Sequence, residues 1–112
     1  MILFKLRFKV LPSKRKEVIS IFDSLVGPIS VKPGCIGIDL YSDIYHDDGF
    51  ILLVEWKSKA EMVKHIGSDE FRKILALMDL ANESPEVFFH TVSSSEGFEL
   101  IEKVKKNKSN AF

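Results

Sequence analysis

The most informative segment of the chain is Phe50-Ile51-Leu52-Leu53-Val54-Glu55-Trp56, which is apolar at every position before Glu55. Side chains of a strand alternate between two faces, so this segment predicts a strand that is covered on both sides. It follows the turn His46-Asp47-Asp48-Gly49, and the turn follows a second predicted strand, Cys35 to Ser42. A short connection between two strands predicts an antiparallel hairpin.

The flanking sequence predicts two more strands and a helix. Residues 2–10 alternate between apolar and mostly charged side chains, which is typical of a strand with one buried face. Residues 86–92 form the predicted fourth strand. A helix opens at Pro12-Ser13, and Gly27-Pro28 predicts a kink or an early end in it. The apolar stripe of this helix contains Val18, Phe22, Leu25 and Ile29.

The second helical region starts at a capping box, formed by Ser58 and Glu61. The region breaks at Gly67 and resumes at Ser68. We expect the first piece to bury Met62, Val63 and Ile66, and the second to bury Phe71, Ile74, Leu75 and Met78. Within Cys35 to Ser42, we expect Ile36, Ile38 and Leu40 to share one face.

The order β-α-β-β-α-β predicts an α+β, ferredoxin-like sandwich in which both helices cover one face of the sheet. Because the strand at 50–56 needs cover on both sides, we predict a homodimer that buries the other face. Residues 1–93 form the predicted domain, and residues 94–112 form an extension. A short helix is predicted there from Ser95 to Lys105, packing through Phe98, Ile101 and Val104 onto its own subunit or its twin.

Composition limits the functions to consider. The 112 residues include 16 Lys plus Arg and 16 Asp plus Glu, which argues against a nucleic-acid partner because phosphate binding needs a surplus of positive charge. The single cysteine, Cys35, allows no internal disulfide and fits a reducing compartment. No apolar segment is long enough for a signal peptide or a membrane span, so we expect a cytoplasmic protein without a membrane partner.

Three groups of residues carry a family resemblance. Residues 32–41 (KPGCIGIDLY), then Trp56-Lys57-Ser58, and then His65 with Ser68-Asp69-Glu70-Phe71 resemble the antibiotic biosynthesis monooxygenase family, over about Ile2 to Val92. The resemblance implies a dimeric α+β barrel with a ligand cavity between sheet and helices. It also implies several possible chemistries, because the family includes oxygenases, haem-degrading enzymes and isomerases.

The sequence departs from two branches of that family. Haem-degrading members use an asparagine on the first strand, a tryptophan and a histidine, whereas this first strand has no asparagine and the other two places hold His65 and Leu75. Many other members carry a glutamate two residues before the strand-ending tryptophan. Here that place is Val54, and Glu55 falls on the opposite face of the strand.

His65 is the candidate catalytic residue, because histidine titrates near neutrality and can remove a phenolic proton. The alternative is a partly buried histidine that hydrogen-bonds to backbone at the helix break. Candidate substrate-binding residues are Trp56, Phe71, Tyr41 and His90, each of which has a purely structural alternative. His46, Asp47 and Asp48 are adjacent turn residues, so we predict no metal site. No cofactor motif is present.

The leading hypothesis is a cofactor-independent monooxygenase that oxidises a small aromatic substrate, of quinol or polyketide-phenol type, with O2. An electron-rich phenolate can pass an electron to oxygen without a metal or flavin once its proton is removed. The alternatives are a non-catalytic small-molecule-binding or interaction module, favoured by the missing glutamate, and a small-metabolite isomerase with His65 as proton shuttle.

Overall fold

The computed structural model describes residues 1–46 and 48–110, except the side chains of residues 109 and 110. Asp47, part of the predicted turn, therefore lies outside the described residues. The elements follow in the order β1 (Ile2–Lys9), a 3-10 turn η1 (Pro12–Lys14), α1 (Arg15–Ser30), β2 (Cys35–Ser42), β3 (Gly49–Trp56), α2 (Lys59–Ile66), α3 (Phe71–Asp79), β4 (Glu86–Thr91) and α4 (Phe98–Asn110).

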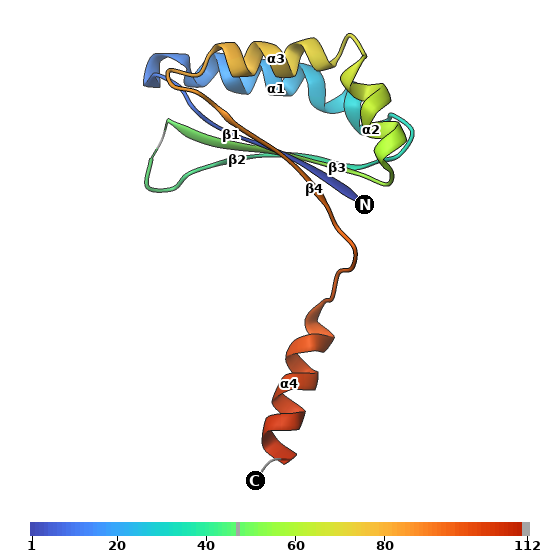
Figure 1. The fold of residues 1–112 in the computed structure, drawn as a ribbon. Coiled ribbons are helices and arrows are strands. Elements are labelled where there is room, and N and C mark those ends of the chain that lie inside the picture. The colour runs from blue at the N-terminus through green and yellow to red at the C-terminus, as the bar shows by residue number, and fades with distance from the viewer. Residues whose placement is uncertain (47, 111–112) are drawn as a thin grey trace.

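The four strands form one antiparallel sheet in the order β2-β3-β1-β4. Helices α1, α2 and α3 lie together on one face of this sheet (Figure 1). The predicted ferredoxin-like α+β fold is therefore confirmed.

The core lies between the sheet and these three helices. Alternate residues of β1 pair with alternate residues of β3, so that each row of the sheet presents two apolar side chains to the helices. The paired residues are Ile2 with Trp56, Phe4 with Val54, Leu6 with Leu52, and Phe8 with Phe50, all at most 7% exposed. Val18, Leu25 and Ile29 of α1 and Ile74 and Leu77 of α3 close the core from above.

The predicted early end of the first helix at Gly27-Pro28 is wrong, because α1 continues to Ser30. A proline inside a helix leaves the carbonyl four residues earlier without its N–H donor. Here that carbonyl belongs to Ser24, and the Nζ atom of Lys73 on α3 donates to it at 3.3 Å. The neighbouring helix thus replaces the hydrogen bond that Pro28 removes.

The predicted face of β2 is wrong at Ile36, which is 49% exposed. A β-bulge causes this, since Cys35 pairs with Trp56 and Gly37 pairs with Glu55, which leaves Ile36 without a partner in the ladder. Beyond the bulge, Ile38 lies in the core as expected and is 7% exposed.

The predicted helical stripes need two further corrections. On α2, Val63 and Ile66 are exposed, and His65 is buried beside Met62 instead. On α3, Leu75 is exposed, and Leu77 occupies the core next to Ile74. Both errors shift the buried stripe by one or two positions, because a helix of eight or nine residues allows only two turns to define it.

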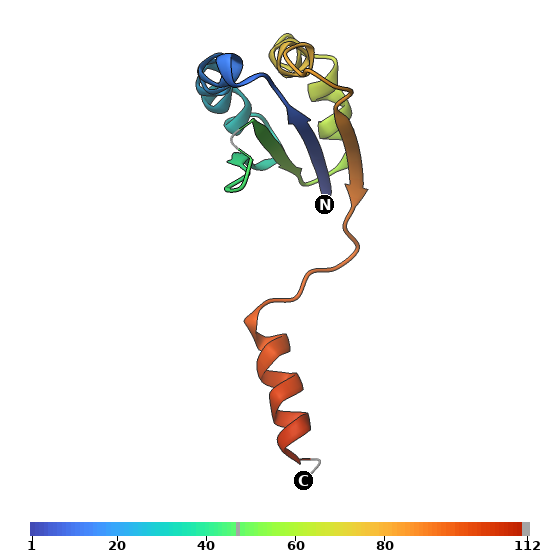
Figure 2. The same cartoon turned by 90° about the vertical axis from the view of Figure 1, so that its left-hand side faces the viewer.

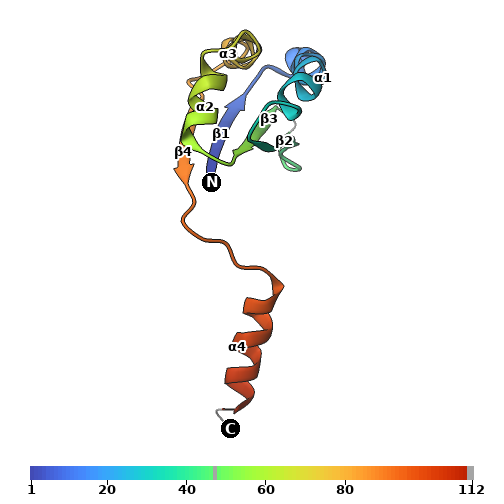
Figure 3. The same ribbon diagram turned by 90° about the vertical axis from the view of Figure 1, so that its right-hand side faces the viewer.

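Helix α4 stands apart from the rest of the molecule in all three ribbon views (Figures 1, 2 and 3). It begins three residues later than predicted and extends to Asn110. Its apolar residues Phe98, Ile101 and Val104 are 69%, 49% and 55% exposed, so they do not pack on their own subunit. No helix in the described part of the chain has the length and apolar character needed to cross a bilayer.

The sheet face opposite the helices is not covered by any described element of the chain (Figure 2). It presents Leu53 of β3 between Lys5 of β1 and Asp39 of β2, and Ile51 beside Arg7 and Tyr41. Phe88 lies next to Lys5 on the edge strand β4. We call this surface the open face.

Candidate functional site

A pocket of about 530 Å³ opens where the end of α1, the end of β3 and the α2–α3 turn meet. This volume is within the range typical of small-molecule sites. The lining residues are Lys32, Pro33, Trp56, Glu61, Lys64, His65, Gly67 and Ser68. They come from the segments that carry the family resemblance and from the capped helix α2.

Helix α2 places His65 in its last turn, over the end of β3. The helix begins because the Ser58 side chain accepts a hydrogen bond from the Glu61 N–H, as the capping box predicts. Gly34 lies against Glu61, the second residue of this capping box. Its φ of +82° favours glycine, and a Cβ atom there would overlap the Glu61 carboxylate. The turn before β2 and the start of α2 therefore approach closely, which fixes one wall of the pocket.

The His65 ring is enclosed by aromatic side chains. It is 4% exposed, its centroid lies 4.8 Å from that of Trp56, and Phe71 meets it edge-on at 5.6 Å. Phe71 in turn contacts Phe4 of the core at 6.2 Å. The structure thus brings together three of the predicted site residues, His65, Trp56 and Phe71.

Ser68 determines which nitrogen of the His65 ring carries the proton. Its hydroxyl donates to the His65 backbone carbonyl at 2.5 Å and lies 3.4 Å from Nδ1. A hydroxyl has one hydrogen, so Ser68 can only accept from Nδ1, and the neutral ring has its free lone pair on Nε2. Nε2 is buried and has no hydrogen-bond partner among the described residues.

Burial lowers the pKa of the His65 ring from 6.5 to about 4, because a protonated ring loses solvation there. The positive charge of Lys32 lowers this pKa further, and the negative charge of Glu70 opposes it. At neutral pH the ring is therefore uncharged. An uncharged imidazole with a buried, unpartnered Nε2 can accept a hydrogen bond or a proton from a bound molecule.

Lys32 and Glu70 form an ion pair beside this ring, with Nζ and Oε2 3.0 Å apart. Glu70 precedes the first residue of α3, so the pair joins the end of α1 to the start of α3. The hydrogen bond from Lys32 is the main reason that the pKa of the Glu70 carboxyl lies below its ordinary value. The Glu70 carboxyl is therefore ionised at neutral pH, and it holds Lys32 at the pocket.

Tyr41 and His90 do not lie with His65. Both project from the open face, where Tyr41 is next to Ile51 and His90 is next to Leu3. They are on opposite edge strands, and the His90 ring stacks on Phe88 at 5.6 Å. Tyr41 lines a separate hollow of about 170 Å³ at the other end of β3.

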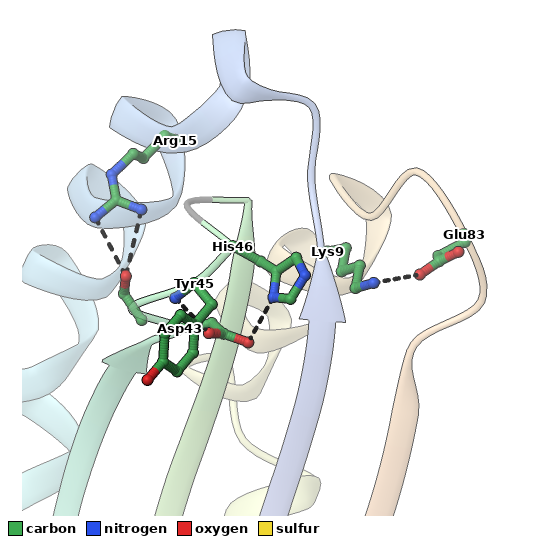
Figure 4. A network of polar contacts seen from close by, with 7 residues as sticks. Lys9, Arg15, Asp43, Tyr45, His46 and Glu83 are labelled. Atoms are coloured by element: carbon green, nitrogen blue, oxygen red, sulfur yellow. Dashed lines mark hydrogen bonds and ion pairs between the residues drawn. The ribbon is translucent and has the colours of Figure 1, made fainter.

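The predicted turn before β3 also lies at that other end of the strand (Figure 4). Asp43 accepts hydrogen bonds there from the backbone N–H of Tyr45 and from the His46 ring, at 2.8 and 3.2 Å. The Tyr45 N–H is the main reason that the pKa of the Asp43 carboxyl is lowered. Within residues 1–46 and 48–110, no three side chains of metal-binding type converge.

Sequence reasoning did not select Ser68, which contacts His65, or the ion pair of Lys32 and Glu70 beside it. Ser68 belongs to the family motif, and its position three residues after His65 at a helix end is a usable signal for a contact. Lys32 and Glu70 are 38 residues apart (70 − 32), and no local pattern predicts their pairing.

Comparisons with known proteins agree with this geometry. The family model described as antibiotic biosynthesis monooxygenase matches residues 1–77. The YcnE protein of Bacillus subtilis, whose assignment as a monooxygenase is provisional, is 32% identical over 68% of this chain and 80% of its own length. An uncharacterised protein of Synechocystis is 25% identical over 79% of this chain, but the match spans only 60% of that protein.

A solved structure extends the comparison to the fold. SnoaB of Streptomyces nogalater, described as a cofactor-independent oxygenase, superposes with a TM-score of 0.72 at 18% identity, over 84% of this chain and 94% of SnoaB. Because the family model covers more than half of the sequence, the chain belongs to the antibiotic biosynthesis monooxygenase family.

Proposed function

We propose that the chain is a cofactor-independent monooxygenase that oxidises a small aromatic hydroxy compound, of quinol or polyketide-phenol type, with O2. The observation that carries this proposal is His65, whose Nε2 is buried, uncharged at neutral pH and without a partner among the described residues. Family membership supports it, and so does the fold shared with SnoaB, a cofactor-independent oxygenase.

The proposed reaction uses few protein groups. The phenolic O–H of the substrate transfers its proton to Nε2 of His65, which leaves a phenolate. The phenolate passes one electron to O2, and the resulting aryloxyl radical and superoxide combine through a new C–O bond. His65 returns its proton to this peroxide anion, and loss of water from the resulting hydroperoxide gives a quinone, so one substrate and one O2 yield one quinone and one water. Trp56 and Phe71 enclose the His65 ring and limit the access of solvent to that ring.

One observation favours a second candidate, a non-catalytic binding module. Val54 occupies the position where many family members carry a glutamate, and it is fully buried in the core. Glu55 cannot replace that glutamate, because it pairs with Leu3 and Gly37 on the open face. The absence of this glutamate is equally compatible with an isomerase that uses the same pocket.

Oxygen uptake by the metal-free protein with a panel of quinols tests the proposal. We expect uptake above the spontaneous rate, with one O2 consumed per quinone formed. His65→Ala should lower turnover roughly 10²–10⁴-fold, the range for loss of a positioned base. His46→Ala, which removes an exposed histidine at the other end of β3, is the matched control and should retain the wild-type rate. Absence of uptake with every quinol in a well-folded protein would favour the binding module.

We also propose that the chain is a homodimer that buries its open face. The support is chemical: Ile51 and Leu53 of β3 lie on this face, and Phe88 extends the apolar area to the edge strand. A small aromatic molecule is the proposed ligand of each subunit.

A further inference from the structure

Lys32 is a second polar residue at the pocket that contains His65. Its side chain is 21% exposed, and together with His65 it lines the same pocket. Its Nζ atom is anchored by Glu70 at 3.0 Å, the only partner of Nζ among the described residues. An ammonium group has three N–H donors, so two of them are left for water or a ligand.

We propose that Lys32 forms a subsite for the phenolate oxygen of the substrate, where negative charge develops when His65 removes the phenolic proton. This inference rests on the proposed function, and it names the chemical class that the pocket selects: an aromatic whose ionised hydroxyl faces an ammonium group. The ion pair with Glu70 orients the lysine before the substrate arrives, so little rearrangement is needed during the reaction.

The charges around the pocket favour Lys32 over its neighbour for this role. The charged residues Lys32, Lys64 and Glu61 line the pocket, and Glu70 forms an ion pair with Lys32. Glu61 is held at the start of α2 by Ser58, and Lys64 is an exposed residue of α2. Only Lys32 is both anchored and close enough to His65 for its charge to lower the pKa of that ring.

Proton transfer to His65 needs such a group. A phenol ionises near pH 10 in water, so a base with a pKa of about 4 falls short by roughly 6 units, or about 8 kcal/mol. Attraction between the new phenolate and the imidazolium recovers part of this deficit. An ammonium group within about 4–6 Å typically shifts the pKa of an acid by 1–3 units in the required direction.

The test measures ionisation of a bound phenol and needs no turnover. 4-Nitrophenol is the probe, because its phenolate absorbs visible light and its electron-poor ring resists oxidation. We expect the bound probe to ionise at a pH about 1 unit or more lower in the wild type than in Lys32→Met, which removes the charge at similar volume. Lys32→Arg should keep the wild-type value, and Lys64→Met, which removes the other ammonium group that lines the pocket, should shift it less than Lys32→Met does. Melting curves establish that each variant is folded.

The outcomes separate this inference from the proposed function. Equal ionisation in the wild type and Lys32→Met, equal effects of the Lys32 and Lys64 variants, or absence of probe binding would each overturn the subsite, whatever the oxygen uptake. A shift that depends on Lys32 in a protein that consumes no oxygen with any quinol would instead support the phenolate subsite and favour the binding module over the oxygenase.

Discussion

His65 is a titratable side chain in a place that excludes its charged form. The unfolded chain binds a proton at this residue below about pH 6.5, whereas the folded chain binds it only below about pH 4. Stability therefore falls as the pH drops from about 6.5 to about 4, because the unfolded state binds more protons there. The shift corresponds to a loss on the order of 3 kcal/mol in the free energy of unfolding.

This loss can be measured by comparing urea unfolding of the wild type and His65→Phe across pH 4 to 7. Phenylalanine keeps an apolar ring but binds no proton, so we expect the variant to lose less stability towards acid than the wild type. Other titrating groups act on both proteins and cancel in the difference. Parallel stability curves would show that His65 is solvated enough to be charged in the fold.

Gly34 provides a second prediction at this scale. We expect Gly34→Ala to lower the free energy of unfolding by more than about 1–2 kcal/mol, the range for a left-handed residue with a side chain. The added Cβ would also displace the Glu61 carboxylate from the cap of α2. Gly27→Ala is the matched control: it meets no atom within 4 Å on α1, and should stabilise the helix slightly. Equal melting temperatures for the two variants would contradict the close approach.

The candidate site could be predicted only where its residues are neighbours in sequence or belong to a known motif. His65, Trp56 and Phe71 carried the resemblance, and the structure places them in ring contact. Tyr41 and His90 lie on predicted strands, and the alternation of side chains along a strand does not say which face of the sheet meets the helices. The contacts of His65 with Trp56 and Phe71 depend on packing between different elements, and no local periodicity of the sequence predicts such contacts.

Individual elements were predictable to the extent that their patterns were long. The alternation in β1 and the continuous apolar run in β3 each cover seven or eight residues, and the structure confirms both strands. The bulge at Ile36 breaks the period inside β2, and one extra residue without a ladder partner leaves no mark on an apolar sequence. The continuation of α1 through Pro28 depends on Lys73, a residue of another helix.

Helix α4 is the element whose role is most open to experiment. Because its apolar side is exposed on its own subunit, we predict that truncation after Ser94 weakens self-association and leaves the unfolding of the isolated subunit unchanged. Sedimentation measures the first effect, and melting at low protein concentration measures the second. Identical sedimentation of the truncated and full chains would mean that α4 is only appended.

The whole molecule is an asymmetric sandwich: helices α1, α2 and α3 pack on one face of the sheet, and no described element packs on the other (Figure 2). We predict a stable dimer at micromolar concentration that buries upwards of ~2,000 Å² in total, the size of an obligate interface. Leu53→Glu should dissociate it, because a charge would be placed in the middle of the open face. Val31→Glu, on an exposed residue after α1, is the matched control. A monomeric wild type in sedimentation would refute the interface.

The segment between β4 and α4 is short, and its length determines how weak a contact of α4 can be and still be occupied. Six residues separate Thr91 from Phe98 (98 − 91 − 1), and at full extension they reach about 20 Å. A helix on such a short tether experiences any surface within reach at an effective concentration in the millimolar range. A docking contact with a dissociation constant of about a millimolar would thus be occupied about half of the time. The same helix, added as a separate peptide at micromolar concentration, would leave that surface almost empty.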